Sequence, residues 1–364
     1  CFARFLNKYR DTMPDIDFDF PHYLRDEVFL KLYQKWGNCV ARISNHNYYH
    51  EKSSLREALR QSGVRKFISK YEINNEISSY DKKLQFKIYK KQKELEGMFR
   101  GYSLHCGGIV YYPDGVPDEL IINGDRTLIP QIKLDKREIA DNKHFKIDIL
   151  SSRGLSQLYT ANSFQEIDFD KYIGDKQTID LLCRGDNIGI TLAETPLMKK
   201  ALMLIKPKTL NDLAICLAII RPAAKNAKKK FEIDMHDSDD IIFDDDIIMV
   251  ISSYLDCDED LGDKIRRGYL KDKNKYKNKI NRCVFNSNRK QKIFEMLENS
   301  RKYGFCKSHA LSYAQLVWGL AYKKAHTPKK FWKATLKNSN SCYRKWVHLY
   351  EARCYGVYAN EREK

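Results

Sequence analysis

Three aspartates alternate with apolar residues near the start of the chain, at Asp15, Asp17 and Asp19 in the stretch DIDFDF. On a β-strand, residues two apart project from the same face, so the carboxylates would crowd one face while the intervening apolar side chains bury the other. Crowded carboxylates raise one another's pKa, and a divalent cation with oxygen ligands removes that penalty. The pattern predicts a metal site or, as the alternative, an edge strand with an acidic solvent face.

A further carboxylate, Asp148, lies in a second apolar stretch, FKIDIL, much later in the chain. If the two strands are neighbours, Asp148 joins the first pair at one end of a sheet. Three carboxylates that hold two metal ions can clamp the attacking hydroxyl and the leaving pyrophosphate of an in-line phosphoryl transfer. Lys146 precedes Asp148 by two residues, so on a strand it faces the same way and can meet a triphosphate.

The elements around these residues are predicted from hydrophobic periodicity and turn residues. A helix is expected from Tyr23 to Trp36, and residues 46–103 are predicted to be helical and charged. From Gly107 onward, GGIVYY, DELIIN and TLIPQI predict a run of short strands, followed by a strand at HFKIDIL.

From Ser151 onward the pattern is almost entirely helical, with two charged interruptions at 224–240 and 271–282. Ser308 is predicted to cap a helix that ends near Pro328. A mixed sheet interrupted by a helical insertion, followed by a large helical domain, is the expected architecture.

The chain is strongly basic. Its 364 residues include 65 Lys and Arg against 48 Asp and Glu, which gives a formal net charge of +17. Such a balance favours a protein that binds the phosphate backbone of nucleic acids, and the alternative is a lysine-rich composition with solvated faces. In the basic stretch 264–292 the interleaved aromatics Tyr269, Tyr276 and Phe285 suit a nucleic-acid path or a solvated loop equally.

Other function classes find little support. No apolar run is long enough to span a membrane, and the N-terminus has no signal-peptide core, so a cytoplasmic location without membrane contact is expected. The ten cysteines include no C-x-x-C pair, which argues against a zinc site.

Several stretches, in chain order, resemble motifs of the alpha subunit of bacterial DNA polymerase III, the C-family replicative polymerases. RFLNKYRDTMPDIDFDF resembles the first palm motif, with Asp15 and Asp17 at its metal-binding positions. FKIDIL places Asp148 at the third aspartate and Lys146 at its companion lysine. KSSLREALRQSG resembles the start of the thumb, and SLHCGGIVYY is similar to the S-x-HAGG-VV segment. The resemblance implies DNA contacts at Lys52, Arg56, Ser103 and His105.

Later stretches resemble the fingers. LAIIRP places Arg221 at the motif arginine, DKIRRG matches the paired arginines Arg266 and Arg267, and YGFCKSHALSYAQ is the closest match in this half. Lys307 would stand at the start of a helix, whose dipole favours an anion. The resemblance implies that the incoming nucleotide is bound by Lys146, Arg221, Arg266, Arg267, Lys307, His309 and Tyr313.

An α+β fold follows from the resemblance, with a mixed-sheet palm of the polymerase-beta-like nucleotidyltransferase type. The expected boundaries are palm at 1–45 and 104–150, a helical thumb at 46–103, and mostly helical fingers at 151–364. The sequence departs from the family where R-P-G-P becomes RPAA, Q-E-Q becomes DDD and F-Q-x-E-S becomes TLAET. The family's PHP domain and its C-terminal segments have no counterpart, so the chain is interpreted as a fragment or a trimmed, divergent relative of bacterial or viral origin.

The expected function is DNA-directed DNA polymerisation, in which Asp15, Asp17 and Asp148 are catalytic and hold two Mg²⁺ ions while dNTPs are added to a primer 3′ end. The expected partners are primer-template DNA and dNTPs, with a sliding clamp and other replisome subunits contacted through segments outside this chain. Two alternatives stay open: a nucleotidyltransferase that needs no template, and a DNA-binding relative that has lost catalysis.

Overall fold

The computed structural model describes residues 4–9, 16–66, 68–69, 72–122, 128–233, 240–284, 286–299, 305–338 and 341–358. The chain divides into two compact units, which we call the sheet unit and the helical unit. The sheet unit comprises Asp15–Phe18 and Glu27–Ile149. The helical unit comprises Cys1–Pro14, Asp19–Asp26 and Leu150–Lys364.

A four-stranded sheet carries the predicted metal-binding residues. Its strands are β1 (Ile16–Pro21), β2 (Val40–Tyr48), β3 (Phe99–Tyr111) and β4 (Lys146–Ser152), in the order β1-β4-β3-β2. The pairs β2–β3 and β3–β4 are antiparallel. His22, just after β1, donates its backbone N–H to the hydroxyl of Ser156, in the helix that follows β4 (2.6 Å). The carboxyl ends of β1 and β4 therefore lie together, and these two neighbouring strands are parallel. The sheet is therefore mixed, and the two aspartate-bearing strands are neighbours, as predicted.

One prediction for β1 is wrong. Phe18 was expected to be buried opposite the carboxylates, yet its side chain is 48% exposed. The reason is that β1 is an edge strand with only β4 beside it. The core under the sheet is instead formed from β2, β3 and the segment after them, by Ala41, Ile43, Val110, Tyr112, Ile132 and Ile139.

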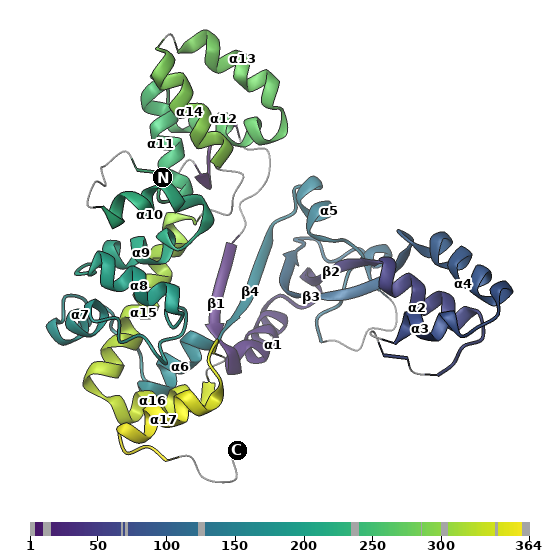
Figure 1. Cartoon of the computed structure of the whole chain (residues 1–364), viewed down its shortest axis with the longest axis horizontal. Coiled ribbons are helices and arrows are strands. Elements are labelled where there is room, and N and C mark those ends of the chain that lie inside the picture. Colours follow the sequence, from purple (N-terminus) through teal and green to yellow (C-terminus); the bar gives the residue numbers. More distant parts are fainter. Residues whose placement is uncertain are drawn as a thin grey trace. The chain divides into compact units, whose positions relative to one another are not determined.

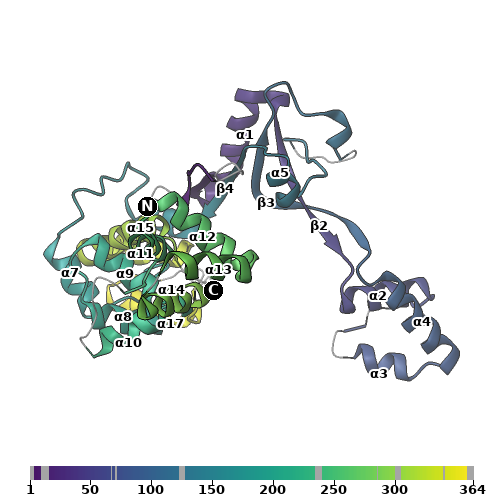
Figure 2. The same ribbon diagram turned by 90° about the horizontal axis from the view of Figure 1, so that it is seen from above.

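A helical insertion separates β2 from β3. It consists of α2 (Glu51–Gln61), α3 (Ile73–Ser78) and α4 (Lys82–Leu95), which lie together at the far end of the β2–β3 ribbon (Figures 1 and 2). These helices surround a core of their own: Leu55, Ala58, Leu59, Ile73, Ile77 and Ile88. The predicted helical region 46–103 is too long at both ends, because the ribbon reaches Tyr48 on one side and starts at Phe99 on the other.

The run of strands predicted after Gly107 is mostly wrong. Only GGIVYY belongs to a strand, β3. DELIIN forms a 3-10 turn, η4 (Asp118–Leu120), and then a single bridge between Ile121 and Ile132. The helices α1 (Arg25–Trp36) and α5 (Lys136–Asp141) complete the sheet region, and α1 confirms the helix expected there.

The helical unit contains two separate cores. In Figure 1 the helices α11–α14 gather apart from the others of this unit. The helices around the larger core are α6 (Arg153–Ala161), α7 (Lys176–Cys183), α8 (Pro196–Ile205), α9 (Leu210–Ile219), α10 (Lys225–Glu232), α15 (Lys307–His326), α16 (Pro328–Asn338) and α17 (Lys345–Cys354). Those around the smaller core are α11 (Asp244–Leu255), α12 (Glu259–Lys271), α13 (Lys273–Cys283) and α14 (Ser287–Asn299). No helix in the described ranges is long and apolar enough to cross a bilayer.

The two charged interruptions predicted for this region are largely helical. The first contains α10, although residues 234–239 lie outside the described part of the chain, and the second is α13. In α13, Tyr276 and Ile280 lie one helical turn apart and belong to the smaller core. This apolar stripe is narrow, and the surrounding lysines conceal it in the sequence.

Candidate active site

Two of the three predicted metal ligands lie on neighbouring strands. Asp17 is on β1 and is exposed, whereas Asp148 on β4 is only 9% exposed. Asp15, the third, lies outside the described residues, and its position remains a prediction. Because β1 and β4 are neighbours, carboxylates that are far apart in the sequence lie on adjacent strands of the sheet.

Lys146 and Asp148 form a partly buried ion pair. The Lys146 Nζ donates to Asp148 Oδ2 at 2.8 Å, and the two side chains are 11% and 12% exposed. The period of two along β4 thus places both on one face, as the sequence predicted. Burying a charge without a partner is costly, so the contact with Lys146 offsets the desolvation of the Asp148 side chain and fixes its orientation.

The second oxygen of the same carboxylate has no hydrogen-bond donor in the described structure. Asp148 Oδ1 is buried, and His105 Nδ1 lies 3.9 Å from it. That nitrogen already accepts hydrogen bonds from the backbone N–H groups of Gly107 (3.3 Å) and Gly108 (2.8 Å). It therefore carries a lone pair rather than a proton, and cannot donate to Oδ1.

Burial reinforces this state of His105. Desolvation lowers the pKa of His105, although the Asp148 carboxylate opposes that shift. The imidazole is consequently neutral at pH 7, and Oδ1 keeps an unsatisfied lone pair in a buried position. A buried carboxylate oxygen without a donor fits a hard cation such as Mg²⁺, which prefers oxygen ligands. Among the described residues no group of three His, Cys, Asp or Glu is arranged to hold a metal ion.

Two glycines allow close packing of β3 at this point, Gly107 against β4 and Gly108 against a side chain of β2. A Cβ on Gly107 would lie 2.6 Å from the backbone oxygen of Ile149, and a Cβ on Gly108 would meet the side chain of Ile43. Gly108 is also the register partner of Asp148. The lack of side chains at both positions therefore allows β3 to pack tightly where it pairs with Asp148.

We expect Gly107→Ala to lower stability by about 1–3 kcal/mol, because the added methyl group meets backbone atoms that cannot move independently. Urea unfolding of both proteins measures this difference. The control is Cys106→Ala, at the neighbouring exposed position of β3, which should stay within about 0.5 kcal/mol of the original chain. An equal effect at both positions would show that the close approach is relaxed in solution.

Three of the four DNA-binding candidates of the sheet unit are solvent-exposed, whereas the side chain of His105 is only 16% exposed. Lys52 and Arg56 are exposed on α2, and Ser103 is exposed on β3, with its hydroxyl 3.5 Å from Asn47 Oδ1. A pocket of about 390 Å³ next to α2 brings four cationic side chains together. These are Arg56, Arg60, Arg65 and Lys66.

In the helical unit, the paired arginines are already bound by an acidic side chain. Asp263, whose side chain is 1% exposed, contacts Arg266 Nη2 at 2.8 Å and Arg267 Nη2 at 2.5 Å. Arg267 also donates to the backbone oxygen of Arg4 at 2.7 Å. The structure brings this pair together with the N-terminal segment, a partner that sequence motifs did not indicate.

The amino end of α15 differs from its prediction. The helix starts at Lys307, with Cys306 at the cap position, so Ser308 lies inside the first turn and does not cap it. The backbone N–H of Lys307 donates to Asp245 Oδ2 at 2.9 Å. A buried carboxylate from α11 therefore takes the role expected of Ser308. The Lys307 Nζ lies 5.8 Å from the centre of the Phe243 ring.

Aromatic contacts gather three predicted nucleotide-binding residues around Phe305. The Arg221 guanidinium lies 4.9 Å from the centre of the Phe305 ring, and the Tyr313 ring lies 6.0 Å from it. His309 is one helical turn from Tyr313, with ring centroids 6.3 Å apart. Tyr313 also packs against the larger core, so both interpretations of it, core residue and site residue, agree with its position.

The residues that sequence reasoning missed are Arg4, Asp245, Asp263 and Phe305. Only Asp263 carried a local signal, because it stands three and four residues before the arginines, at ion-pair spacing on a helix. Of the two interpretations left open for the stretch 264–292, a nucleic-acid path or a solvated loop, neither describes Tyr269, which lies in α12. Tyr269 is fully buried, and its hydroxyl donates to Glu298.

Comparison with known proteins matches two consecutive stretches of the chain to family models. Residues 1–151 match the family model of the bacterial DNA polymerase III alpha NTPase domain, and residues 153–292 match that of the bacterial DNA polymerase III alpha subunit finger domain. The DNA polymerase III subunit alpha of Bacillus subtilis strain 168 is 26% identical over 383 residues, covering 91% of this chain and 34% of the relative. That of Streptococcus pyogenes serotype M1 is 25% identical over 398 residues, covering 94% and 38%. The chain thus spans little more than a third of these relatives.

Proposed function

We propose that this chain, which belongs to the bacterial DNA polymerase III alpha-subunit family, performs templated addition of dNTPs to a primer 3′ end. The observation that supports the proposal is that β1 and β4, which carry Asp17 and Asp148, are neighbours in the sheet, and that the buried Oδ1 of Asp148 lacks a hydrogen-bond donor. In this proposal the sheet with its flanking segments is the palm, the α2–α4 insertion is the thumb, and the helical unit from Ser151 is the fingers.

Asp15, Asp17 and Asp148 are the residues proposed to hold two Mg²⁺ ions. Divalent ions bound there would stabilise the negative charge that develops on the transferred phosphoryl group. The protein's own contribution is positional. Lys146 fixes one oxygen of Asp148, and the other oxygen, Oδ1, is buried.

The nucleotide contacts proposed in the fingers are Arg221, Lys307, His309 and Tyr313, with Arg266 and Arg267 as further candidates. Arg221 and Tyr313 share the Phe305 ring, which limits their rotamers and would reduce the entropy lost on binding. The paired arginines are held by Asp263, so in this proposal they act from fixed positions. Lys52, Arg56, Ser103 and His105 are proposed to contact the DNA.

Primer extension tests the proposal directly. The full chain, Mg²⁺, dNTPs and a primer-template with a 5′ template overhang should give products whose length follows the template. Extension that proceeds equally without a template would favour the template-independent nucleotidyltransferase. DNA binding without any extension would favour the relative that has lost catalysis.

Lys307→Ala should raise the apparent KM for dNTP tenfold or more, equivalent to roughly 1.4 kcal/mol or above. The reason is the loss of a full positive charge at the start of α15, where the helix dipole already favours an anion. Steady-state primer extension at varied dNTP concentration gives KM, and a binding titration gives primer-template affinity, which should not change.

The matched control is Lys323→Ala, on the last turn of the same helix. It should leave the KM for dNTP unaltered. Parallel loss of dNTP and DNA binding in Lys307→Ala would indicate misfolding, and an unchanged KM would make the start of α15 structural only.

A further inference from the structure

Leu192 adopts a backbone conformation that its side chain disfavours. Its φ is +74°, in the left-handed region, where the Cβ of an L-residue crowds the following carbonyl oxygen. Five other described non-glycine residues have positive φ, and all lie just after a helix, where this conformation closes the last turn. They are Lys143, Ser163, Phe164, Lys206 and Asp256. Leu192 follows no helix and lies in the loop between α7 and α8.

The Leu192 side chain does not offset this strain by burial, because it is 43% exposed. Glycine adopts the same conformation without a steric penalty. If the backbone shape were all that mattered here, glycine would be the more stable residue. A leucine at this position thus keeps an apolar side chain in solvent at the expense of stability.

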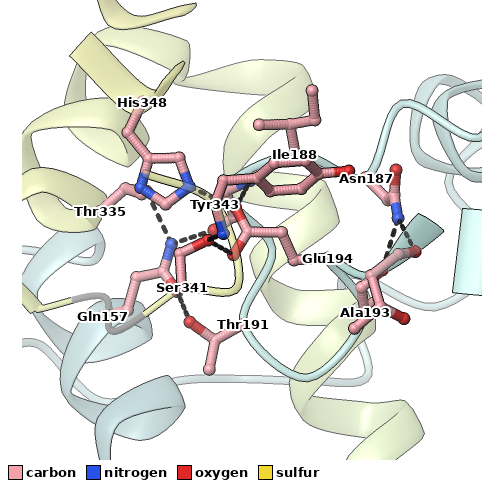
Figure 3. A network of polar contacts seen from close by, with 12 residues as sticks. Gln157, Asn187, Ile188, Thr191, Ala193, Glu194, Thr335, Ser341, Tyr343 and His348 are labelled. Carbon is pink, nitrogen blue, oxygen red and sulfur yellow. Dashed lines mark hydrogen bonds and ion pairs between the residues drawn. The ribbon is translucent and has the colours of Figure 1, made fainter. Parts of the chain in front are cut away.

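The strain persists because the 187–195 loop is held from several sides (Figure 3). Glu194 accepts hydrogen bonds from the backbone N–H of Gly189 (2.7 Å), from the hydroxyl of Ser341 (2.5 Å) and from the His348 ring. Burial alone would raise the pKa of Glu194, but these hydrogen bonds outweigh burial and hold the pKa below its usual value. An ionised carboxylate with three partners therefore fixes the base of the loop.

A second group of buried side chains fixes the other side of the loop. Gln157 donates to the carbonyl of Gly189 (2.6 Å) and accepts from the hydroxyl of Thr191 (2.5 Å), the residue before Leu192. Asn187 donates to the carbonyl of Ala193 (2.6 Å), the residue after it. Both neighbours of Leu192 are thus anchored. Strain that the surroundings enforce in this way is characteristic of functional positions.

The loop that carries Leu192 contacts the first turn of helix α6. The Thr191 methyl group would lie 3.4 Å from a Cβ on Gly154, in the first turn of α6. This helix directly follows β4, the strand that carries Lys146 and Asp148. The residue before Gly154, Arg153, is exposed. An exposed apolar side chain and an exposed cation therefore lie on neighbouring segments of the helical unit.

We propose that Leu192 contacts the DNA substrate, by packing its side chain against a nucleobase or deoxyribose while Arg153 meets a nearby phosphate. This inference rests on the proposed polymerase function. Apolar side chains such as leucine can pack at base steps, and arginine commonly meets the phosphates, where it positions without reading sequence. The net charge of +17 favours nucleic acid over a protein partner for this surface.

Leu192→Gly separates a functional role from a structural one, because the two predict opposite signs of the stability change. The variant relieves the left-handed strain, so the thermal midpoint of the full chain should stay equal or rise. Its Kd for a fluorescein-labelled primer-template with a 5′ template overhang, measured by anisotropy in Mg²⁺-free buffer, should increase at least fivefold. The control is Leu197→Ala, since Leu197 is 42% exposed on α8 and should not affect the Kd.

Two results would overturn the inference: an unchanged Kd for Leu192→Gly, which would favour a protein partner, or a lower thermal midpoint, which would make Leu192 structural.

Binding and extension are measured separately, so the inference and the proposed function can fail independently. Normal extension by the original chain with an unchanged Kd in Leu192→Gly would reject the inference alone. Weakened DNA binding by Leu192→Gly, in a chain that never extends primers, would reject only the polymerase function. Absence of DNA binding by the original chain would overturn both.

Discussion

Asp148→Asn should reduce primer extension at least about a thousandfold, as expected when a transition state stabilised by bound metal ions loses a ligand. The substitution keeps the size of the side chain, and the asparagine oxygen can still accept from Lys146, which is 2.8 Å from Oδ2 in the original chain. We therefore expect a modest change in stability and nearly unchanged affinity for primer-template DNA. Single-turnover extension, thermal unfolding and anisotropy titration measure the three quantities.

Asp114→Asn is the control for this prediction, because Asp114 is exposed in the turn after β3. It should extend primers at the original rate. Near-normal extension by Asp148→Asn would remove Asp148 from the mechanism, and equal losses in both variants would show that the assay reports net charge rather than the site.

Affinity for primer-template DNA should fall steeply with salt, because each phosphate neutralised by a lysine or arginine releases condensed counterions. If about five phosphates are neutralised, log K against log [salt] should have a slope near −4 to −5. Between 50 and 200 mM salt the affinity would then fall by about 250- to 1,000-fold. A filter-binding titration over this range measures the slope.

The net charge of +17 and the exposed cations on α2 motivate this expectation. Removing Lys52 and Arg56 together should make the slope shallower by about two, since each contributes close to one unit. A slope near zero in the original chain would mean that the positive charge is a composition bias and not a path for DNA.

The strand β1 was predictable because the alternation of apolar and acidic residues carries the period of a strand. That it neighbours β4 was only a condition of the prediction, and the structure shows that this condition is met. The same period placed Lys146 beside Asp148, and the structure confirms it. Helices α2 and α4 were also predictable, from apolar residues at helical spacing that form the core of the insertion.

Two predictions of secondary structure failed for different reasons. In the strands predicted after β3, apolar residues are buried without forming regular strands, because burial does not specify backbone pairing. Ile121 and Ile132 supply the apolar signal of two strands, yet they form one isolated bridge. The segment that forms α13 was predicted to be a charged interruption, yet it is a helix. Its many lysines obscure a narrow apolar stripe that includes the fully buried Ile280. The spacing of apolar residues therefore predicts secondary structure reliably only when the segments that pair or pack with them are also known.

Contacts between distant segments were beyond the sequence pattern. The cap of α15 comes from Asp245, and no local rule connects that residue to Lys307. Likewise, the position of His105 suggested a site residue, but only the hydrogen bonds from two backbone amides establish which ring nitrogen lacks a proton. Candidate site residues could be proposed from the sequence, whereas the protonation of His105 and the partner of the Lys307 backbone could not.

The insertion of α2–α4 between β2 and β3 has a consequence for the order in which the molecule forms. The ends of the insertion are joined by backbone hydrogen bonds, from Tyr49 N to Met98 O (2.9 Å) and from Gly97 N to Tyr49 O (2.8 Å). Because these helices have a core of their own, they can fold during synthesis while β2 waits for β3. The edge strand β1 is made first but pairs with the last strand, β4, a non-local contact that forms slowly. The segment of β1 therefore stays unpaired for most of the synthesis of the sheet unit. During this period, repulsion between the carboxylates of β1 opposes aggregation of the nascent chain.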